Sequence, residues 1–199
     1  FSVEMTRALL TGRKTMTRRV VKLPLKDRDF GCELAGNEIG PAEASRLCPY
    51  GQSGDLLWVR ETFQYESRTE EYEWDIKKCR IVYRATEPNA GPWVDADDKI
   101  SEAWRPSIHM PRWASRLALL IEDVRVERLQ EISEADAIAE GAEPVLVPPD
   151  GGSCPHRQGF LELWESLHGS DSWPANPFVW RIQFRPILQN VDAYMREAA

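Results

Sequence analysis

The order of helix-like and strand-like segments limits the folds open to this chain more than any other feature. Strand-like segments are separated by short helices and irregular stretches, without the regular strand–helix–strand alternation that builds a parallel sheet. The clearest strand is the last one, in which Phe178, Trp180, Ile182 and Phe184 share one face. This order predicts an α+β fold or a small barrel decorated by short helices, interrupted by long loop insertions.

Local patterns predict where the other elements lie. Ser133 and Asp136 resemble a capping box, and Gly141 stands where a short helix would end. The expected elements are helices over 2–10, 133–141 and 160–167, an extended segment over 15–21, and strands over 56–63, 78–85, 115–129 and 178–184. Three insertions are expected, at about 27–53, 88–113 and 141–159. We expect a single domain over 1–186 and a C-terminal tail over 187–199.

The charge pattern excludes some classes of partner. The chain has 25 Lys and Arg against 32 Asp and Glu, a net charge of −7, which argues against nonspecific coating of nucleic acid. The first thirty residues nevertheless carry eight basic and three acidic side chains, and residues 103–118 contain three arginines and no acid. Such local patches suit a small anionic ligand or a short nucleic-acid segment, although ordinary solvated charge is the alternative.

Hydropathy and cysteine spacing bear on location and cofactors. The longest apolar run, residues 117–121, is far shorter than the roughly 20 residues of a membrane span, and no signal peptide is evident. We therefore expect a cytoplasmic protein without membrane association. The four cysteines lie far apart, without a C-x-x-C pair, which predicts reduced thiols rather than a disulfide scaffold. The spacing of Cys154 and His156 matches no usual zinc pattern, so no metal is expected.

The densest polar segment runs from Gly12 to Arg19. If its second half is extended, Thr15, Thr17 and Arg19 share one face, and Lys14 comes from the turn just before it. Burial and neighbouring arginines would both lower the pKa of such a lysine, because each disfavours the ammonium form. A neutral lysine can act as a base toward a hydroxyl group. The alternative is a solvated basic turn.

The pattern Gly12-x-Lys14-x-x-Thr17-x-Arg19 resembles the signature of the ASCH domain, a PUA-like β-barrel family associated with RNA binding and RNA modification. Gly54-Asp55-x-Leu57-x-Val59-Arg60 is similar to the turn-and-strand element of that family, and the final strand also fits. Residues 48–51, 58–62 and 105–114 resemble the phage and prophage branch. The resemblance spans most of residues 5–186. It implies an α+β fold built on a PUA-like small mixed β-barrel, decorated by short helices and carrying long loop insertions.

One branch of the ASCH family consists of small amidohydrolases that remove acetyl from N4-acetylcytidine. By motif position, the resemblance implies that Lys14 and Thr17 are catalytic, and a local match places the third catalytic residue at Glu140, with Glu134 and Glu61 as rivals. Thr17 would attack the amide carbonyl, neutral Lys14 would accept its proton, and the glutamate would protonate the leaving amine. Arg19 or main-chain N–H groups would stabilise the oxyanion, and no cofactor is required. The family enzymes are shorter, so the insertions could reshape the pocket.

The resemblance also implies contacts with RNA or a nucleoside. Residues 104–113 interleave aromatic and basic side chains, which would form a stacking platform if exposed and ordinary core if buried. The predicted binding residues are Arg13, Arg19, Arg60, Arg105, Arg112 and Trp113. Two alternative functions stay open: a non-catalytic module that binds RNA or a modified nucleotide, and a nuclease that cleaves single-stranded RNA. The phage-type motifs fit a role in host or phage nucleic-acid metabolism.

Overall fold

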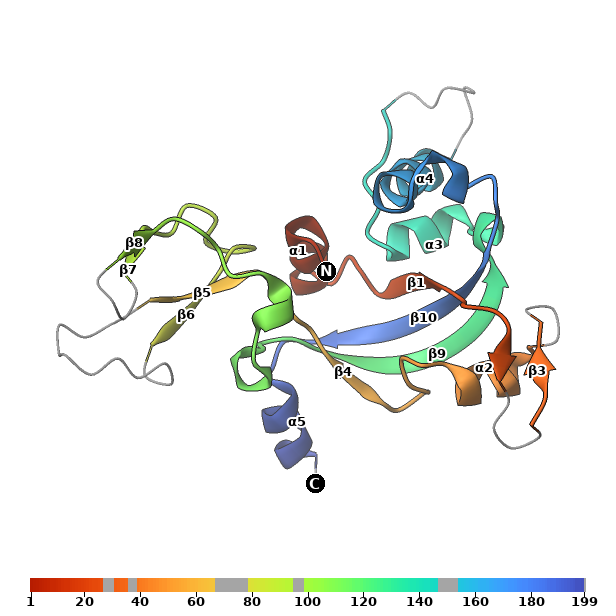
Figure 1. Cartoon of the computed structure of the whole chain (residues 1–199), viewed down its shortest axis with the longest axis horizontal. Helices are drawn as coiled ribbons and strands as arrows, with labels where there is room; N and C mark the ends of the chain where they lie inside the picture. The colour runs from red at the N-terminus through yellow and green to blue at the C-terminus, as the bar shows by residue number, and fades with distance from the viewer. Residues whose placement is uncertain (27–30, 36–38, 67–78, 95–98, 147–153, 199) are drawn as a thin grey trace. The chain divides into compact units, whose positions relative to one another are not determined.

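The computed structural model describes residues 1–26, 31–35, 39–66, 79–94, 99–146 and 154–198 (Figure 1). The chain divides into two compact units, which we describe separately. The first consists of Phe1–Leu10, Trp58–Ala118 and Leu188–Ala199, and the second of Thr11–Leu57 and Leu119–Ile187. The expectation of a single domain over 1–186 stays a prediction.

The main sheet has four strands in the order β1 (Met16–Val20), β10 (Phe178–Ile187), β9 (Ala118–Arg128) and β4 (Leu56–Trp58). It is antiparallel and strongly curled, like half of a small barrel, as the long strands β9 and β10 show in Figure 1. Six of the ten residues of β10 are β-branched or aromatic, the types that favour strands. The expectation of an α+β fold with a barrel-like sheet is confirmed at this level.

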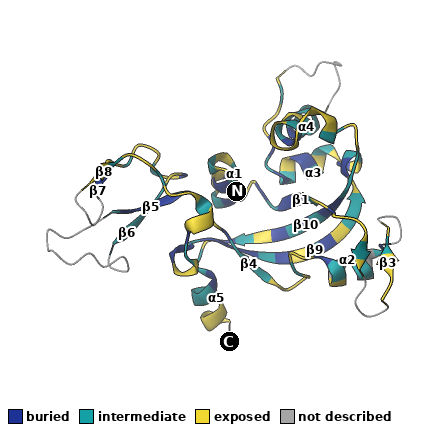
Figure 2. Cartoon of the chain, in the orientation of Figure 1, coloured by how far each residue is buried: buried dark blue, intermediate teal, exposed yellow. Residues whose placement is uncertain are grey.

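The register of β1 against β10 determines which side chains share a face. Thr17 pairs with Ile182, whereas Arg18 pairs with Arg181. Because paired residues project to the same side and neighbours alternate, Thr17 lies on the face of Ile182 and Arg18 lies on the opposite face. Both faces are largely buried in this part of the sheet (Figure 2). One face is apolar around Ile182, and the other carries two arginines.

Two helices cover the arginine-bearing side. Helix α3 (Glu134–Ala139) begins as predicted, since the Ser133 hydroxyl accepts the Asp136 N–H at 3.1 Å. It ends before Gly141, whose φ of +76° allows the main chain to turn and whose N–H binds the Ile138 carbonyl.

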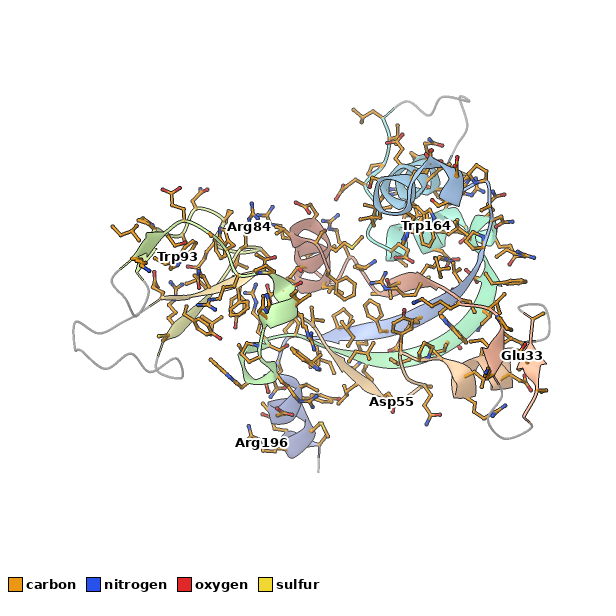
Figure 3. All side chains as sticks on the ribbon, in the orientation of Figure 1. Glu33, Asp55, Arg84, Trp93, Trp164 and Arg196 are labelled. Carbon is orange, nitrogen blue, oxygen red and sulfur yellow. The ribbon has the colours of Figure 1, made fainter. Side chains whose placement is uncertain are left out.

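Helix α4 (Pro155–His168) packs against α3 through an apolar cluster. Phe160 and Trp164 are its largest members, and Val179 of β10 completes it. Figure 3 labels Trp164. Burying a side chain of that size stabilises the fold by roughly 2–3 kcal/mol. The apolar spacing predicted this helix over 160–167, and the helix also includes the turn before that range.

The first unit combines short elements around a second apolar cluster. The elements are α1 (Val3–Leu10), β5 (Phe63–Glu66) paired with β6 (Arg80–Tyr83), β7 (Trp93–Val94) paired with β8 (Ile100–Ser101), the 3-10 turns η2 (Ser107–His109) and η3 (Arg112–Ala114), and α5 (Val191–Glu197). Phe63, Tyr65 and Met110 form the centre of the cluster. β5 also meets the chain at Arg105 through a pair of main-chain hydrogen bonds.

Regular structure extends into segments predicted to be irregular. The 27–53 insertion contains β3 (Glu33–Leu34), which pairs with β2 (Leu25–Lys26), and α2 (Pro41–Leu47). The 88–113 insertion contains β7, β8 and the two 3-10 turns. In the third insertion, residues 147–153 lie outside the described residues. Two further 3-10 turns, η4 (Leu129–Glu131) and η5 (Ser170–Ser172), flank α3 and α4 in sequence.

Two boundaries differ from the prediction. The strand expected over 56–63 is two strands, because β4 ends at Trp58 and Phe63 begins a separate pairing with β6. The expected tail forms the end of β10 and then α5, since Asn190 caps that helix by accepting the Asp192 N–H at 3.0 Å. Asn190 also donates to the Ser115 carbonyl at 2.8 Å, so the helix is attached to the first unit.

Among the described helices, none combines the length and the apolar character needed to span a lipid bilayer.

Candidate active site around Lys14

Main-chain hydrogen bonds hold Lys14 at the end of α3. The adjacent Thr15 donates its N–H to the Ala139 carbonyl at 2.8 Å and accepts the Phe184 N–H at 2.8 Å. Gly12, with a φ of +71°, allows the turn that leads into this segment. Lys14 therefore lies between the last residue of α3 and strand β10, and its side chain has no exposed surface.

The Lys14 ammonium makes two contacts with one residue. Its Nζ atom donates to the main-chain carbonyl of Glu140 at 2.6 Å and to Oε2 of the same residue at 2.8 Å. The carbonyl belongs to the C-cap of α3, a position at which helix carbonyls lack an intrahelical partner. Glu140 is only 4% exposed. The two residues thus form a buried ion pair at the helix end.

A second cation, Arg18, extends this pair into a network. Arg18 is fully buried, and its Nη1 atom lies 3.5 Å from Oε1 of Glu140. Its Nε atom donates to Glu127 at 3.0 Å, and its Nη2 atom donates to Glu127 and, at 3.0 Å, to Asp136. Arg181, its partner across the sheet, adds a further cation, which lies 3.5 Å from Asp136. Since two arginines side by side repel each other, the surrounding carboxylates stabilise this arrangement.

The surroundings of Lys14 favour its neutral form. Burial is the largest cause and lowers the pKa of Lys14, and the nearby Arg19 and Arg18 lower it further. The Glu140 carboxylate acts in the opposite direction without reversing the shift. Lys14 is therefore better able to accept a proton than an exposed lysine, which is the direction expected from the sequence.

The pKa of Asp136 is lowered, whereas burial usually raises the pKa of a carboxyl group. Burial by itself would raise its pKa, but the attraction of Arg18 and Arg181 outweighs that and holds the pKa below the usual 3.8. The folded state therefore binds the proton less readily than the unfolded state. The ionised carboxylate stabilises the fold above the unfolded-state pKa, and this stabilisation is lost as the pH falls through the folded-state pKa.

We expect Asp136→Asn to weaken the dependence of stability on pH in this acidic range. Urea unfolding between pH 5 and about 2.5 should show a smaller loss of unfolding free energy for the variant than for the wild type. The same substitution at Asp192, a half-exposed carboxylate paired with Arg112, is the control and should differ less from the wild type, because an exposed ion pair contributes little to stability. Equal slopes for Asp136→Asn and the wild type would contradict the role assigned to Arg18 and Arg181.

Thr17 and Arg19 lie on the other face of β1. Thr17 is 6% exposed, and the alternation of the strand places it with Ile182, opposite Arg18. The hydrogen bonds that join Lys14, Glu140 and Arg18 do not include the Thr17 hydroxyl. Arg19 donates to the main-chain carbonyl of Arg18 at 3.0 Å. The structure thus brings two of the three predicted catalytic residues into contact, and the nucleophilic role of Thr17 stays a prediction.

The two rival glutamates have other partners. Glu134 accepts the N–H groups of His156 and Arg157, each at 2.8 Å, and so caps the start of α4. Glu61 belongs to the first unit, where both of its carboxylate oxygens bind Arg116, at 2.9 and 2.8 Å. Contact with Lys14 therefore favours Glu140 as the third residue.

The predicted binding residues fall in both units. In the second unit, Arg13 is half-exposed and pairs with Glu143 at 2.7 Å. In the first unit, Arg60 lies over the Trp58 ring, Arg105 donates to Gln64 at 3.0 Å, and Arg112 pairs with Asp192 at 2.9 Å. All four keep exposed surface. Carboxylates offset the charges of Arg13 and Arg112, whereas Arg60 and Arg105 contact the neutral side chains of Trp58 and Gln64.

The expected aromatic platform over 104–113 is divided. Trp104 packs edge-on against Trp93, with ring centroids 4.7 Å apart. Trp113 lies nearly parallel to Tyr65 at 6.3 Å and is 43% exposed. One tryptophan of the segment thus belongs to packing within the first unit, and the other keeps surface for a ligand.

Sequence reasoning missed the carboxylates around Arg18. Glu127 comes from β9 and Asp136 from α3, and no motif connects them with the first strand. The alternation of side chains along residues 14–19 could have shown that Arg18 and Arg19 lie on opposite faces of the sheet. Within the described residues, no three His, Cys, Asp or Glu side chains gather as ligands for a metal ion.

Comparison with family models, curated proteins and solved structures finds no match to this chain.

Proposed function

We propose that this chain is a PUA-like hydrolase of the ASCH type, which cleaves the amide bond of an acylated nucleoside such as N4-acetylcytidine, free or within RNA. One observation carries the proposal: the buried amine of Lys14 lies 2.8 Å from the Glu140 carboxylate. A lysine with a lowered pKa next to a carboxylate can accept a proton and pass it on, which is one way to supply the proton transfers of amide cleavage.

The chemistry proceeds in two halves. The Thr17 oxygen bonds to the acyl carbon, and its proton passes to the neutral amine of Lys14. The described hydrogen bonds do not join these two groups, so this transfer requires substrate binding to bring them together. The carbon–nitrogen bond then breaks, and Glu140 shuttles that proton from Lys14 to the leaving amine of cytosine. A water molecule then attacks the acyl group on Thr17. The proton that this water loses returns to the Thr17 oxygen through Glu140 and Lys14, and the free acid leaves. Arg19 or main-chain N–H groups would stabilise the oxyanion in both halves.

The test is hydrolysis of N4-acetylcytidine by the purified protein, with release of cytidine followed by chromatography. We expect Thr17→Val, which has the same shape without a hydroxyl, to be inactive, and Thr17→Ser to keep measurable activity because it retains the nucleophile. Both variants should fold like the wild type. An inactive wild-type protein would refute the assignment for this substrate. An active Thr17→Val protein would instead refute Thr17 as the nucleophile.

A non-catalytic nucleic-acid module is the second candidate, favoured by the exposed ring of Trp113 beside basic side chains in the first unit. Binding of a labelled single-stranded RNA, measured by fluorescence anisotropy, distinguishes it. Binding that weakens in Trp113→Ala, with no hydrolysis by the wild type, would support this second function. Shortening of the same labelled RNA on a gel would indicate the nuclease alternative. A cytoplasmic location and a phage or prophage role stay predictions.

A further inference from the structure

The Glu140 carboxylate is shared between two cations. Its Oε2 atom accepts from Lys14 at 2.8 Å, while its Oε1 atom lies 3.5 Å from Nη1 of Arg18. Arg18 is held independently of that contact, because its other nitrogens bind Glu127 and Asp136. The guanidinium is also fully buried, so it has no freedom to turn toward solvent. Arg18 is therefore a fixed charge beside one oxygen of Glu140.

We propose that Arg18 is a positioning residue: it occupies one oxygen of Glu140 and leaves only the other oxygen to Lys14. The effect of Arg18 on catalysis rests on the proposed function, but the sharing of Glu140 between Arg18 and Lys14 can be tested without any substrate. Arg18 is not one of the positions carried over from the family signature, whose arginine is Arg19. The assignment comes from the contacts of Glu140 alone.

The sharing of Glu140 between Arg18 and Lys14 affects the pKa of Lys14. The charged groups that act on Lys14 among the described residues are Glu140 from the end of α3, Arg18 from β1 and, from the other face of that strand, Arg19. Without Arg18, Glu140 would give both oxygens to Lys14, and one repelling charge would be gone. Both changes favour the ammonium form and raise the pKa of Lys14. Arg18 thus keeps more of Lys14 in the form that accepts a proton.

Arg181 offers a matched control. It is the cross-strand partner of Arg18 and shares two of its carboxylates, at 3.5 Å from Asp136 and 3.9 Å from Glu127. Its described ion pairs do not include Glu140. Arg181→Met therefore removes one positive charge from the network without releasing either oxygen of Glu140.

The experiment follows the ε-carbon of Lys14 by NMR during a pH titration, in protein labelled with 13C-lysine. The Lys14 signal is assigned by its disappearance in Lys14→Met. We expect the titration midpoint of Lys14 to lie at higher pH in Arg18→Met than in the wild type, and to stay in place in Arg181→Met. Arg18→Lys, which retains the charge, should bring the midpoint back toward the wild-type position. Arg18→Gln serves in place of Arg18→Met if that variant does not fold.

The same variants are assayed for hydrolysis of N4-acetylcytidine across the pH range. The limb of the kcat/KM profile that requires neutral Lys14 should move to higher pH in Arg18→Met, with activity on that limb reduced about three- to tenfold and recovered at higher pH. A purely structural role would lower activity equally at every pH, and that result would overturn the proposal.

The two proposals fail in different ways. An unchanged Lys14 midpoint in a folded Arg18→Met or Arg18→Gln protein overturns the role of Arg18, even if the wild type hydrolyses the substrate. A shifted midpoint in a protein without hydrolytic activity supports the sharing of Glu140 and refutes the proposed function.

Discussion

Lys14→Met is expected to lower kcat/KM for N4-acetylcytidine by about 10³-fold, the middle of the range for removal of a general acid or base. Methionine nearly matches the length of lysine and suits a buried position, but it cannot accept a proton. Glu140 keeps Arg18 as a partner in this variant, so the remaining carboxylate is not left without a cation. Loss of activity should therefore come with a folded protein, as measured by circular dichroism and by the thermal midpoint.

Lys22→Met is the control for this prediction. Lys22 follows β1 closely in sequence but is exposed, so the same substitution there changes the charge of the segment without reaching the site. We expect its kcat/KM to stay within about twofold of the wild-type value, as is usual for surface substitutions. If Lys14→Met retained comparable activity, Lys14 would not be the base, and the proposed mechanism would have to be abandoned.

Glu140→Ala should cause the largest loss of stability among the substitutions considered. The change removes the carboxylate that faces two buried cations, and breaking a buried ion pair typically costs about 3–5 kcal/mol. We expect a value near the lower end, about 3 kcal/mol. Lys14 can lose its proton and keeps the Glu140 carbonyl, and Arg18 retains Glu127 and Asp136. Urea unfolding at neutral pH measures the difference directly.

Glu143→Ala provides the comparison, only a few residues further along the chain. Glu143 also pairs with a cation of the first basic segment, Arg13 at 2.7 Å, but its side chain is 75% exposed. Exposed pairs of this kind contribute little, so we expect a change below about 1 kcal/mol. Similar losses for Glu140→Ala and Glu143→Ala would show that the buried pair has no special part in stability.

Local rules explain why some elements could be predicted from the sequence. The limits of α3 depend on Ser133, whose hydroxyl caps the first turn, and on Gly141, whose positive φ ends the helix. Both effects act within a few residues, so the sequence alone contains them. The alternation in β10 is local in the same way. Helix α5 depends on a local signal too, because Asn190 is a favourable N-cap residue at its start.

The network around Arg18 could not be found in this way. Alternation along β1 separates Arg18 from Thr17, but it does not show which face α3 covers. Arg18 gains its partners from β9 and α3, which follow it by more than a hundred residues. The different surroundings of Trp104 and Trp113 could not be predicted for the same reason. Their partners, Trp93 and Tyr65, come from strands of the first unit that lie elsewhere in the sequence.

The sequence by itself determined the α+β class, the limits of α3, the apolar face of β10 and the position of Lys14 beside other cations, because each depends on neighbouring residues. Only the tertiary structure decided that Glu140, rather than Glu134 or Glu61, meets Lys14. That contact joins residues 126 positions apart. It forms because main-chain hydrogen bonds from Thr15 hold the start of β1 against the end of α3, and such long-range packing leaves no local pattern in the sequence.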